Sequence, residues 1–209
     1  RTVKDKLAYV AGFVDMIEIN NTFYRPPEAK TVESWVTRTA GKPGFFFTAK
    51  LHQDITHGSK IEPVIVKAFH EGLKPMTDAG VLKHLLAQFS FRLTDSAANR
   101  SHLAAIKDSF GDISNITLEL RHNSWQSKQA LEFLSSLNVT VANLDYPASR
   151  DAFTLRYCAV GRNAYFRLHG RNSKAWFDKK AGRDETYNYR YSVEELRDIS
   201  SRISEIEKH

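Results

Sequence analysis

The sequence predicts an α/β fold with parallel strands, a TIM-like (β/α)8 barrel of which six strands can be identified. Short strand-like segments alternate with amphipathic segments along the chain, which is typical of parallel strands joined by crossover helices. No glycine-rich phosphate-binding turn follows any strand, which disfavours the open doubly wound sheet. Polar residues occupy one phase of the strands and gather at their carboxyl ends, where barrels carry their active sites.

Six segments are predicted to be strands because they are short and rich in β-branched or aromatic residues. They are Val14–Asn20, Phe45–Leu51, Leu82–Phe89, Ile116–Arg121, Val139–Asp145 and Ala164–His169. In the fourth of them, apolar residues alternate with Thr117, Glu119 and Arg121, so these three side chains share one face. Strands buried on both faces usually consist of unbroken apolar runs, so this polar face indicates a functional site.

Five helices are predicted from amphipathic spacing and from signals at their ends. They are Pro27–Ala40, Ile61–Asp78, Ala97–Phe110, Ser127–Leu137 and Ser192–Glu207. The last begins with Ser192 followed three residues later by Glu195, which is the spacing of a capping box. No linker, repeat or low-complexity segment interrupts the pattern, so we expect a single barrel domain over residues 1–209.

Composition excludes several classes of protein. The chain has 209 residues, 42% of them apolar, which is enough for a substantial core and excludes a disordered or fibrous protein. No apolar run approaches the roughly 18–20 residues that span a bilayer, so we expect no membrane partner. The single cysteine, Cys158, excludes an internal disulfide. No export signal is apparent in the sequence, so we expect a cytoplasmic protein.

Distinctive motifs follow several of the predicted strands. They are Ile17–Tyr24, Glu119–Trp125 and Arg167–Asn172, with shorter motifs at Ile55–His57 and Asp145–Pro147. In this order, they resemble the signature segments of the YecE-like family, which is also known as domain of unknown function 72. The resemblance implies a TIM-like barrel of soluble, mostly bacterial proteins, and it implies no established reaction.

The resemblance also implies strands that this sequence lacks. Members of the family usually begin with a strand ahead of the helix that starts here near Arg1, and they usually end with a strand beyond His209. We therefore expect a fragment of a longer chain, because an intact barrel has about 250 residues. The segment Gln88–Phe91 departs from the family, since it has a serine where proline is usual.

Four titratable residues near strand ends are the candidate catalytic groups. They are Glu18, Glu119, Asp145 and His169. We expect one of them to act as a general acid or base, and Glu119 is the first candidate for the base. The carboxylates could instead form interior ion pairs with neighbouring cations, because an unpaired buried charge is costly. They could also bind a divalent metal together with the histidine. We expect no cofactor, with the metal as the alternative.

The candidate substrate-binding residues include several cations. They are Lys50, Arg121, Arg167 and Arg171, with Asn20, Tyr24, Asn143 and Trp125 beside them at strand ends. Guanidinium groups offer forked donors that match a phosphate or a carboxylate, so the arginines predict a small anionic substrate. The alternative role of the arginines is to hold the carboxylates, and that of the aromatic residues is core packing. We expect the charged groups to converge in one cleft.

These residues predict an enzyme, of the hydrolase or isomerase type, that performs acid/base chemistry on a small anionic substrate. The alternatives are a metal-dependent phosphodiester hydrolase and a non-catalytic module that binds nucleic acid. The latter depends on Lys174–Arg190, where basic residues alternate with aromatic ones as in contacts with single-stranded nucleic acid. We expect this segment to be a mobile loop without helical periodicity that lies over the site. The oligomeric state stays open.

Overall fold

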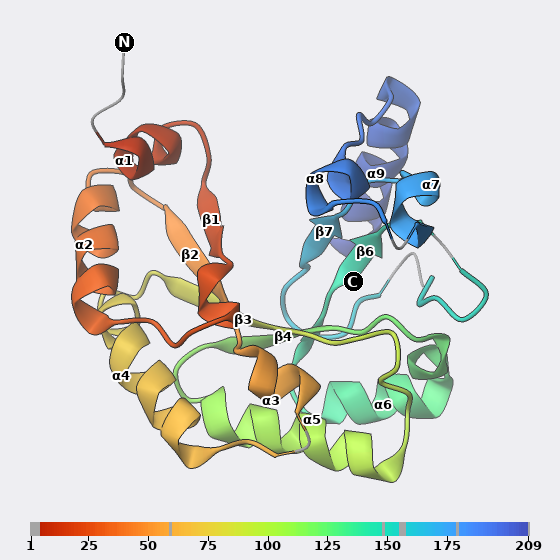
Figure 1. Cartoon of the computed structure of the whole chain (residues 1–209), viewed down its shortest axis with the longest axis horizontal. Coiled ribbons are helices and arrows are strands. Elements are labelled where there is room, and N and C mark those ends of the chain that lie inside the picture. The colour runs from red at the N-terminus through yellow and green to blue at the C-terminus, as the bar shows by residue number, and fades with distance from the viewer. Residues whose placement is uncertain (1–4, 59, 148, 155–157, 179, 209) are drawn as a thin grey trace. The chain divides into compact units, whose positions relative to one another are not determined.

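The computed structural model describes residues 5–58, 60–147, 149–154, 158–178 and 180–208. The chain divides into two compact units. Unit 1 consists of residues 1–88 and 97–117, and unit 2 consists of residues 89–96 and 118–209. Figure 1 shows the helices and strands of both units. Within the described residues, no helix has the length and the apolar character needed to cross a membrane.

Unit 1 is built on parallel strands. These are β1 (Met16–Ile19), β2 (Phe46–Lys50), β3 (Leu82–Gln88) and the start of β4 (Asn115–Glu119), which lie side by side in this order. Glu18 of β1 lies opposite Thr48 of β2, and Thr48 lies opposite His84 of β3. The register therefore places polar residues of neighbouring strands in one row.

The helices of unit 1 are consistent with the amphipathic pattern of the sequence. They are α1 (Lys6–Ala11), α2 (Ala29–Thr39), α3 (Gln53–His57), α4 (Pro63–Asp78) and α5 (Ala97–Phe110), with a short 3-10 helix at Asn21–Phe23. The chain passes from each strand into helical structure before the next strand begins (Figure 1). Phe69 of α4 and Phe110 of α5 are both fully buried, and their ring centroids lie 6.0 Å apart. These apolar helix faces supply much of the core.

Unit 2 contains the strands that carry most of the candidate site. After the end of β4 come β5 (Thr140–Val141), β6 (Asn143–Asp145) and β7 (Phe166–Leu168), of which β5 lies beside β4 and β6 pairs with β7 in parallel. The helical segments of this unit are Asn123–Gln126 (3-10), α6 (Lys128–Ser136), α7 (Ser173–Phe177), α8 (Arg183–Tyr187) and α9 (Val193–Ile206). Among the described strands, β1, β5, β6 and β7 each pair on one side only, so these strands do not form a closed sheet.

The predicted strand Val139–Asp145 was wrong in one respect, because it is two short strands. Ala142 separates these two strands. The backbone N–H of Ala142 donates to Leu118 of β4, whereas the N–H groups before and after it, those of Val141 and Asn143, donate to Val160 and Tyr165. The other five predicted strands and the five predicted helices are confirmed, with boundaries that differ by at most a few residues. The capping box of Ser192 and Glu195 at the start of α9 is confirmed as well.

The prediction that Lys174–Arg190 lacks helical structure was also wrong. The segment contains α7 and α8, apart from Lys179, which lies outside the described residues. The Asn172 side chain explains how helices this short form. Its oxygen accepts a hydrogen bond from the backbone of Ala175, and its Nδ2 donates to the carbonyl of Glu185 at 3.1 Å. One side chain thus caps α7 and links it to α8.

Candidate functional site

Glu119, at the carboxyl end of β4, is the centre of the candidate site in unit 2. Its side chain is fully buried. Arg121 donates from Nε and Nη2 to Glu119 Oε1, at 2.8 and 2.6 Å, and Arg167 donates from Nη1 to Oε2. His169 Nε2 lies 3.4 Å from Oε1. One buried carboxylate is therefore bound by two guanidinium groups, which leaves the three charged groups with a net charge of about +1 at neutral pH.

Strand periodicity brings these four residues together. Glu119 and Arg121 are two positions apart at the end of β4, and Arg167 and His169 are two positions apart at the end of β7. Residues with this spacing point to the same face of a strand. The sequence predicted that these four groups converge together with Glu18 and Asp145. Within unit 2 the structure brings the four together, whereas the Asp145 carboxylate binds other partners.

The electrostatics of Glu119 correct its predicted role as the first candidate for the base. Burial alone would raise the pKa of the Glu119 carboxyl, but His169 and the guanidinium groups of Arg121 and Arg167 outweigh burial. The pKa is held well below its usual range, so the carboxylate is a weak proton acceptor near neutral pH. The hydrogen bonds of Glu119 suit it to hold the guanidinium groups of Arg121 and Arg167 in place.

His169 is better placed than Glu119 to exchange a proton. It is 8% exposed, and its Nε2 makes no hydrogen bond to the part of the chain that the structure describes, although it lies within ion-pair distance of Glu119. The Glu119 carboxylate, 3.4 Å from this nitrogen, is therefore placed to orient the imidazole. Histidine also changes its charge near physiological pH more readily than other side chains.

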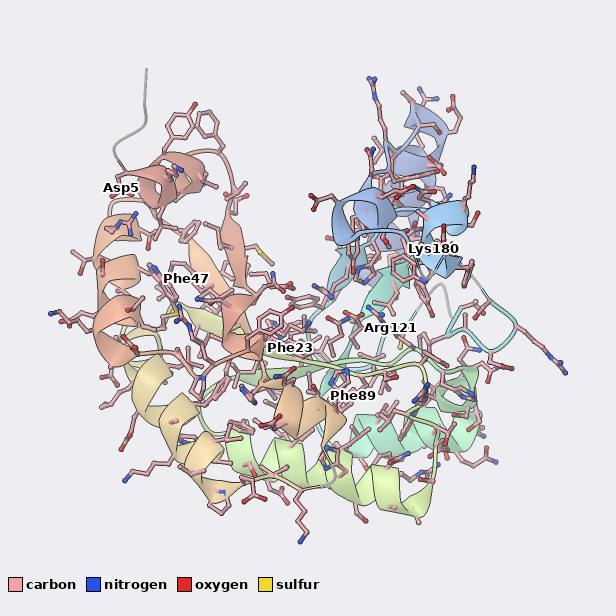
Figure 2. All side chains as sticks on the ribbon, in the orientation of Figure 1. Asp5, Phe23, Phe47, Phe89, Arg121 and Lys180 are labelled. Atoms are coloured by element: carbon pink, nitrogen blue, oxygen red, sulfur yellow. The ribbon has the colours of Figure 1, made fainter. Side chains whose placement is uncertain are left out.

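Three aromatic residues surround His169 and form what we call the aromatic wall: Tyr146, Trp176 and Tyr187. Their ring centroids lie 6.4, 5.9 and 6.1 Å from the imidazole. Arg121, labelled in Figure 2, has its guanidinium carbon 5.8 Å from the centroid of the Trp176 ring. The aromatic wall therefore lies directly beside the cations of the site.

Asp145, at the end of β6, lies in a separate network of hydrogen bonds. Arg171 donates to both of its carboxylate oxygens, at 2.8 and 2.6 Å, and the hydroxyl of Tyr191 donates at 3.0 Å. Arg202 of α9 donates at 3.4 Å. Burial would raise the pKa of Asp145, but these partners, with Arg171 first among them, lower it. With its oxygens bound in this way, Asp145 fits a positioning role better than a catalytic one.

Two of the predicted substrate-binding residues have structural partners. The Asn143 amide accepts a hydrogen bond from the backbone N–H of Cys158 and donates one to the Cys158 carbonyl, both at 3.0 Å. Trp125 is fully buried, and its Nε1 donates to the carbonyl of Leu93 at 2.8 Å. Both side chains are buried and hydrogen-bonded to the backbone, so we leave both residues out of the site.

We expect Asn143→Ala to lower the free energy of unfolding by about 2–3 kcal/mol, because it leaves a buried N–H and a buried carbonyl of Cys158 without this partner. Urea denaturation monitored by circular dichroism measures the change. The control is Asn188→Ala, which removes an exposed side chain and should change the free energy by less than about 0.5 kcal/mol. A loss for Asn143→Ala no greater than that of the control would contradict the structural role.

The other predicted site residues, Glu18, Asn20, Tyr24 and Lys50, belong to unit 1. Asn20 donates to the backbone carbonyl of Glu18 at 3.3 Å, and Tyr24 is 64% exposed. The Lys50 ammonium lies 3.8 Å from the centroid of the Phe23 ring, which is close enough for a cation–π interaction. These four residues lie at or just after the ends of β1 and β2, as predicted.

The sequence interpretation missed one buried titratable residue of unit 1. His84 of β3 lies with its Nδ1 2.8 Å from the hydroxyl oxygen of Thr117, and burial lowers the pKa of its imidazole to about 4. His84 is therefore neutral at physiological pH. The signal was present, because His84 lies in the same strand phase as the polar residue Gln88, whereas the apolar Leu85 and Ala87 lie in the other phase.

The donor groups do not favour the metal alternative. Within the described residues, no three His, Cys, Asp or Glu side chains lie close enough together to hold a metal ion. In unit 2, a metal would also have to displace the guanidinium groups from Glu119 or Asp145. The arrangement of charges is better suited to an anion.

Comparisons with known proteins agree with the resemblance found in the sequence. The family model described as "Protein of unknown function DUF72" matches residues 1–209. The UPF0759 protein YunF of Bacillus subtilis (strain 168) is 27% identical over 218 residues, which cover 97% of this chain and 76% of that protein.

Solved structures of two DUF72 family proteins are similar to this chain. The protein from Enterococcus faecalis V583 has a TM-score of 0.86 and 26% identity, over 98% of this chain and 78% of its own. The protein from Thermotoga maritima MSB8 has a TM-score of 0.80 and 28% identity, over 96% of this chain and 75% of its own. These similarities confirm the predicted class of fold.

Proposed function

The chain belongs to the DUF72 family of proteins of unknown function, and we propose that it binds a small substrate through a phosphate or carboxylate group and performs acid/base chemistry on it. The observation that carries this proposal is the meeting of Arg121 and Arg167 at one buried carboxylate. Two guanidinium groups held by one carboxylate retain a positive charge in a largely desolvated place. Such a place favours an anion, because low polarity strengthens electrostatic attraction.

His169 is the proposed proton-transfer group. Its Nε2 lies beside the ionised Glu119, which would orient the imidazole. Catalytic hydrogen bonds are often long in the absence of substrate, so the separation of 3.4 Å is compatible with this role. The proposal therefore gives Glu119 an orienting role and His169 the role of acid or base.

The segment of α7 and α8 supports this proposal more than it supports a module that binds nucleic acid. Trp176 and Tyr187 contact His169, so their rings belong to the wall of the site. Long single strands are bound by successive exposed aromatic side chains along a groove. Two of the aromatic residues that suggested such a surface instead contact His169, which favours the proposed small-molecule site.

Anion binding is tested by titrating the protein with inorganic phosphate in a calorimeter. We expect Arg167→Gln to weaken phosphate binding by about tenfold to a hundredfold, because a hydrogen bond to a charged group contributes about 1.5–3 kcal/mol. Phosphate should also shift the imidazole resonances of His169 in NMR spectra. Arg167→Lys keeps the charge beside Glu119 but loses the forked donor, so it should fold like the wild type and bind with intermediate affinity.

The matched control is Arg197→Gln, which removes the same charge from an exposed position on α9. It should leave the affinity within about twofold, apart from the weak general effect of charge. If Arg167→Gln and Arg197→Gln bind phosphate equally well, or if acetate and phosphate both fail to bind the wild type, the proposed function is wrong.

A further inference from the structure

We infer that the ligand of this site carries its anionic group on a planar aromatic ring, and that Trp176 selects for this ring. The inference rests on the proposed function, because it takes Arg121 and Arg167 to be the residues that bind the anion. It goes further by naming the chemical class of the rest of the ligand.

Trp176 lies beside the residues that would bind the anion, where it could contact the ring of such a ligand. The guanidinium carbon of Arg121 is 5.8 Å from the centroid of its ring, and the His169 ring centroid is 5.9 Å from it. Trp176 is partly exposed, unlike Trp125, which is fully buried in the core. The indole is therefore not sealed in the core, and it lies near the cation that would hold the anion.

The backbone on both sides of Trp176 is tied down by hydrogen bonds. Asn172 Nδ2 donates to the carbonyls of Glu185 and Asn188, at 3.1 and 3.4 Å, which links the start of α7 to the end of α8. The backbone N–H of Gly170 donates to the Tyr191 hydroxyl at 2.9 Å, which joins the two ends of the segment 170–191 that contains α7 and α8. A wall held in this way loses little conformational entropy when a ligand binds, so it can discriminate between ligands by shape.

Gly170 makes the close approach of these two ends possible. Its φ of +82° lies in the left-handed region, and an added Cβ would lie 2.6 Å from the Cβ of Tyr189. Only glycine fits both requirements without strain. The local structure that holds Trp176 is thus specified by the sequence between β7 and α9.

The chemistry of the wall favours an aromatic ring over a saturated one. Guanidinium groups stack on aromatic faces, and Arg121 already lies near one such face in Trp176. Trp176 meets Tyr187 at 85° and Tyr146 at 45°, so a planar ring can contact one neighbour with its face and another with its edge. A saturated ring of the same size buries similar area but has no π face for these contacts.

Phenyl phosphate and cyclohexyl phosphate test the inference, because they carry the same charge on rings of similar size. We expect the wild type to bind phenyl phosphate about fivefold to tenfold more tightly than cyclohexyl phosphate in calorimetric titrations. Trp176→Leu should reduce this ratio to about twofold or less. Trp176→Phe should retain part of the preference, since it keeps an aromatic face.

The matched control is Phe177→Leu, which removes the neighbouring aromatic side chain of α7, exposed to 55%. It should leave the ratio unchanged. Melting temperatures show whether each variant folds, and Trp176→Phe tests the inference if the leucine variant does not.

The inference is overturned if the wild type binds the two esters equally well, or if Trp176→Leu and Trp176→Phe both keep the full preference. In either case, binding of inorganic phosphate that depends on Arg167 would still support the proposed function. If inorganic phosphate does not bind, or binds independently of Arg167, the proposed function and the inference both fail.

Discussion

Glu119→Gln should lower the free energy of unfolding by about 3–5 kcal/mol, because it removes the charge that compensates two largely buried guanidinium groups. The side chains of Arg121 and Arg167 are only 19% and 15% exposed, and that of Glu119 is not exposed at all. Without the carboxylate, the two cations would face each other in a place that water reaches poorly. Urea denaturation at pH 7 measures the loss.

The control for this change is Glu194→Gln, which replaces an exposed glutamate in the first turn of α9. It should change the free energy of unfolding by less than about 0.5–1 kcal/mol. If the two variants are equally stable, Glu119 is not the charge that holds the two arginines.

Glu119→Gln should also make the free energy of unfolding depend less steeply on pH in the acid range. The pKa of Glu119 is lower in the folded protein than in the unfolded chain, where it is about 4.3. Its contribution is therefore fully present above that value and is lost as the pH falls toward the folded pKa. Between about pH 5 and pH 2, the wild type should lose stability more steeply than Glu119→Gln. Asp145 titrates in the same direction in both proteins, so the difference between the two curves reports Glu119.

Strand phase was enough to find the centre of this site. Glu119 and Arg121 on one strand, and Arg167 and His169 on another, each interrupt an apolar alternation near a carboxyl end. In parallel strands, these ends lie at the same edge of the sheet, so the residues can meet without any knowledge of the loops. The predicted pairing of Glu119 with the arginines is confirmed for this reason.

Strand phase was not enough to distinguish a residue that binds a ligand from one that binds the backbone. Asn143 has the same phase as Asp145, but its partner is Cys158, which lies in an irregular segment 15 residues further along the chain. The helices α7 and α8 escaped prediction for a related reason. Helices of five residues are unstable alone, and these two are linked by hydrogen bonds from Asn172 to Glu185 and Asn188, 13 and 16 positions away. Local periodicity contains no information about such partners.

Asp145→Asn should lower the free energy of unfolding by about 3–5 kcal/mol, although the groups that bind the Asp145 carboxylate are not those that bind Glu119. Its carboxylate binds Arg171 through two hydrogen bonds, and it also binds the buried Arg202, whose side chain is only 4% exposed. Loss of the negative charge leaves Arg202 of α9 with a poorer partner in a buried place. Asp184→Asn, which changes an exposed aspartate of α8, is the matched control and should be nearly neutral.

A double-mutant cycle with Arg171→Gln separates this network from the rest of the protein. The two substitutions should be less than additive, with a coupling energy of about 0.5–3 kcal/mol, since each removes the partner of the other. Well below its melting temperature, the Asp145→Asn protein should bind inorganic phosphate with an affinity within about threefold of that of the wild type. The reason is that Arg121, Arg167 and His169 keep their partner Glu119. A folded Asp145→Asn protein that no longer binds phosphate would show instead that Asp145 belongs to the binding site itself, as its place at the end of β6 first suggested.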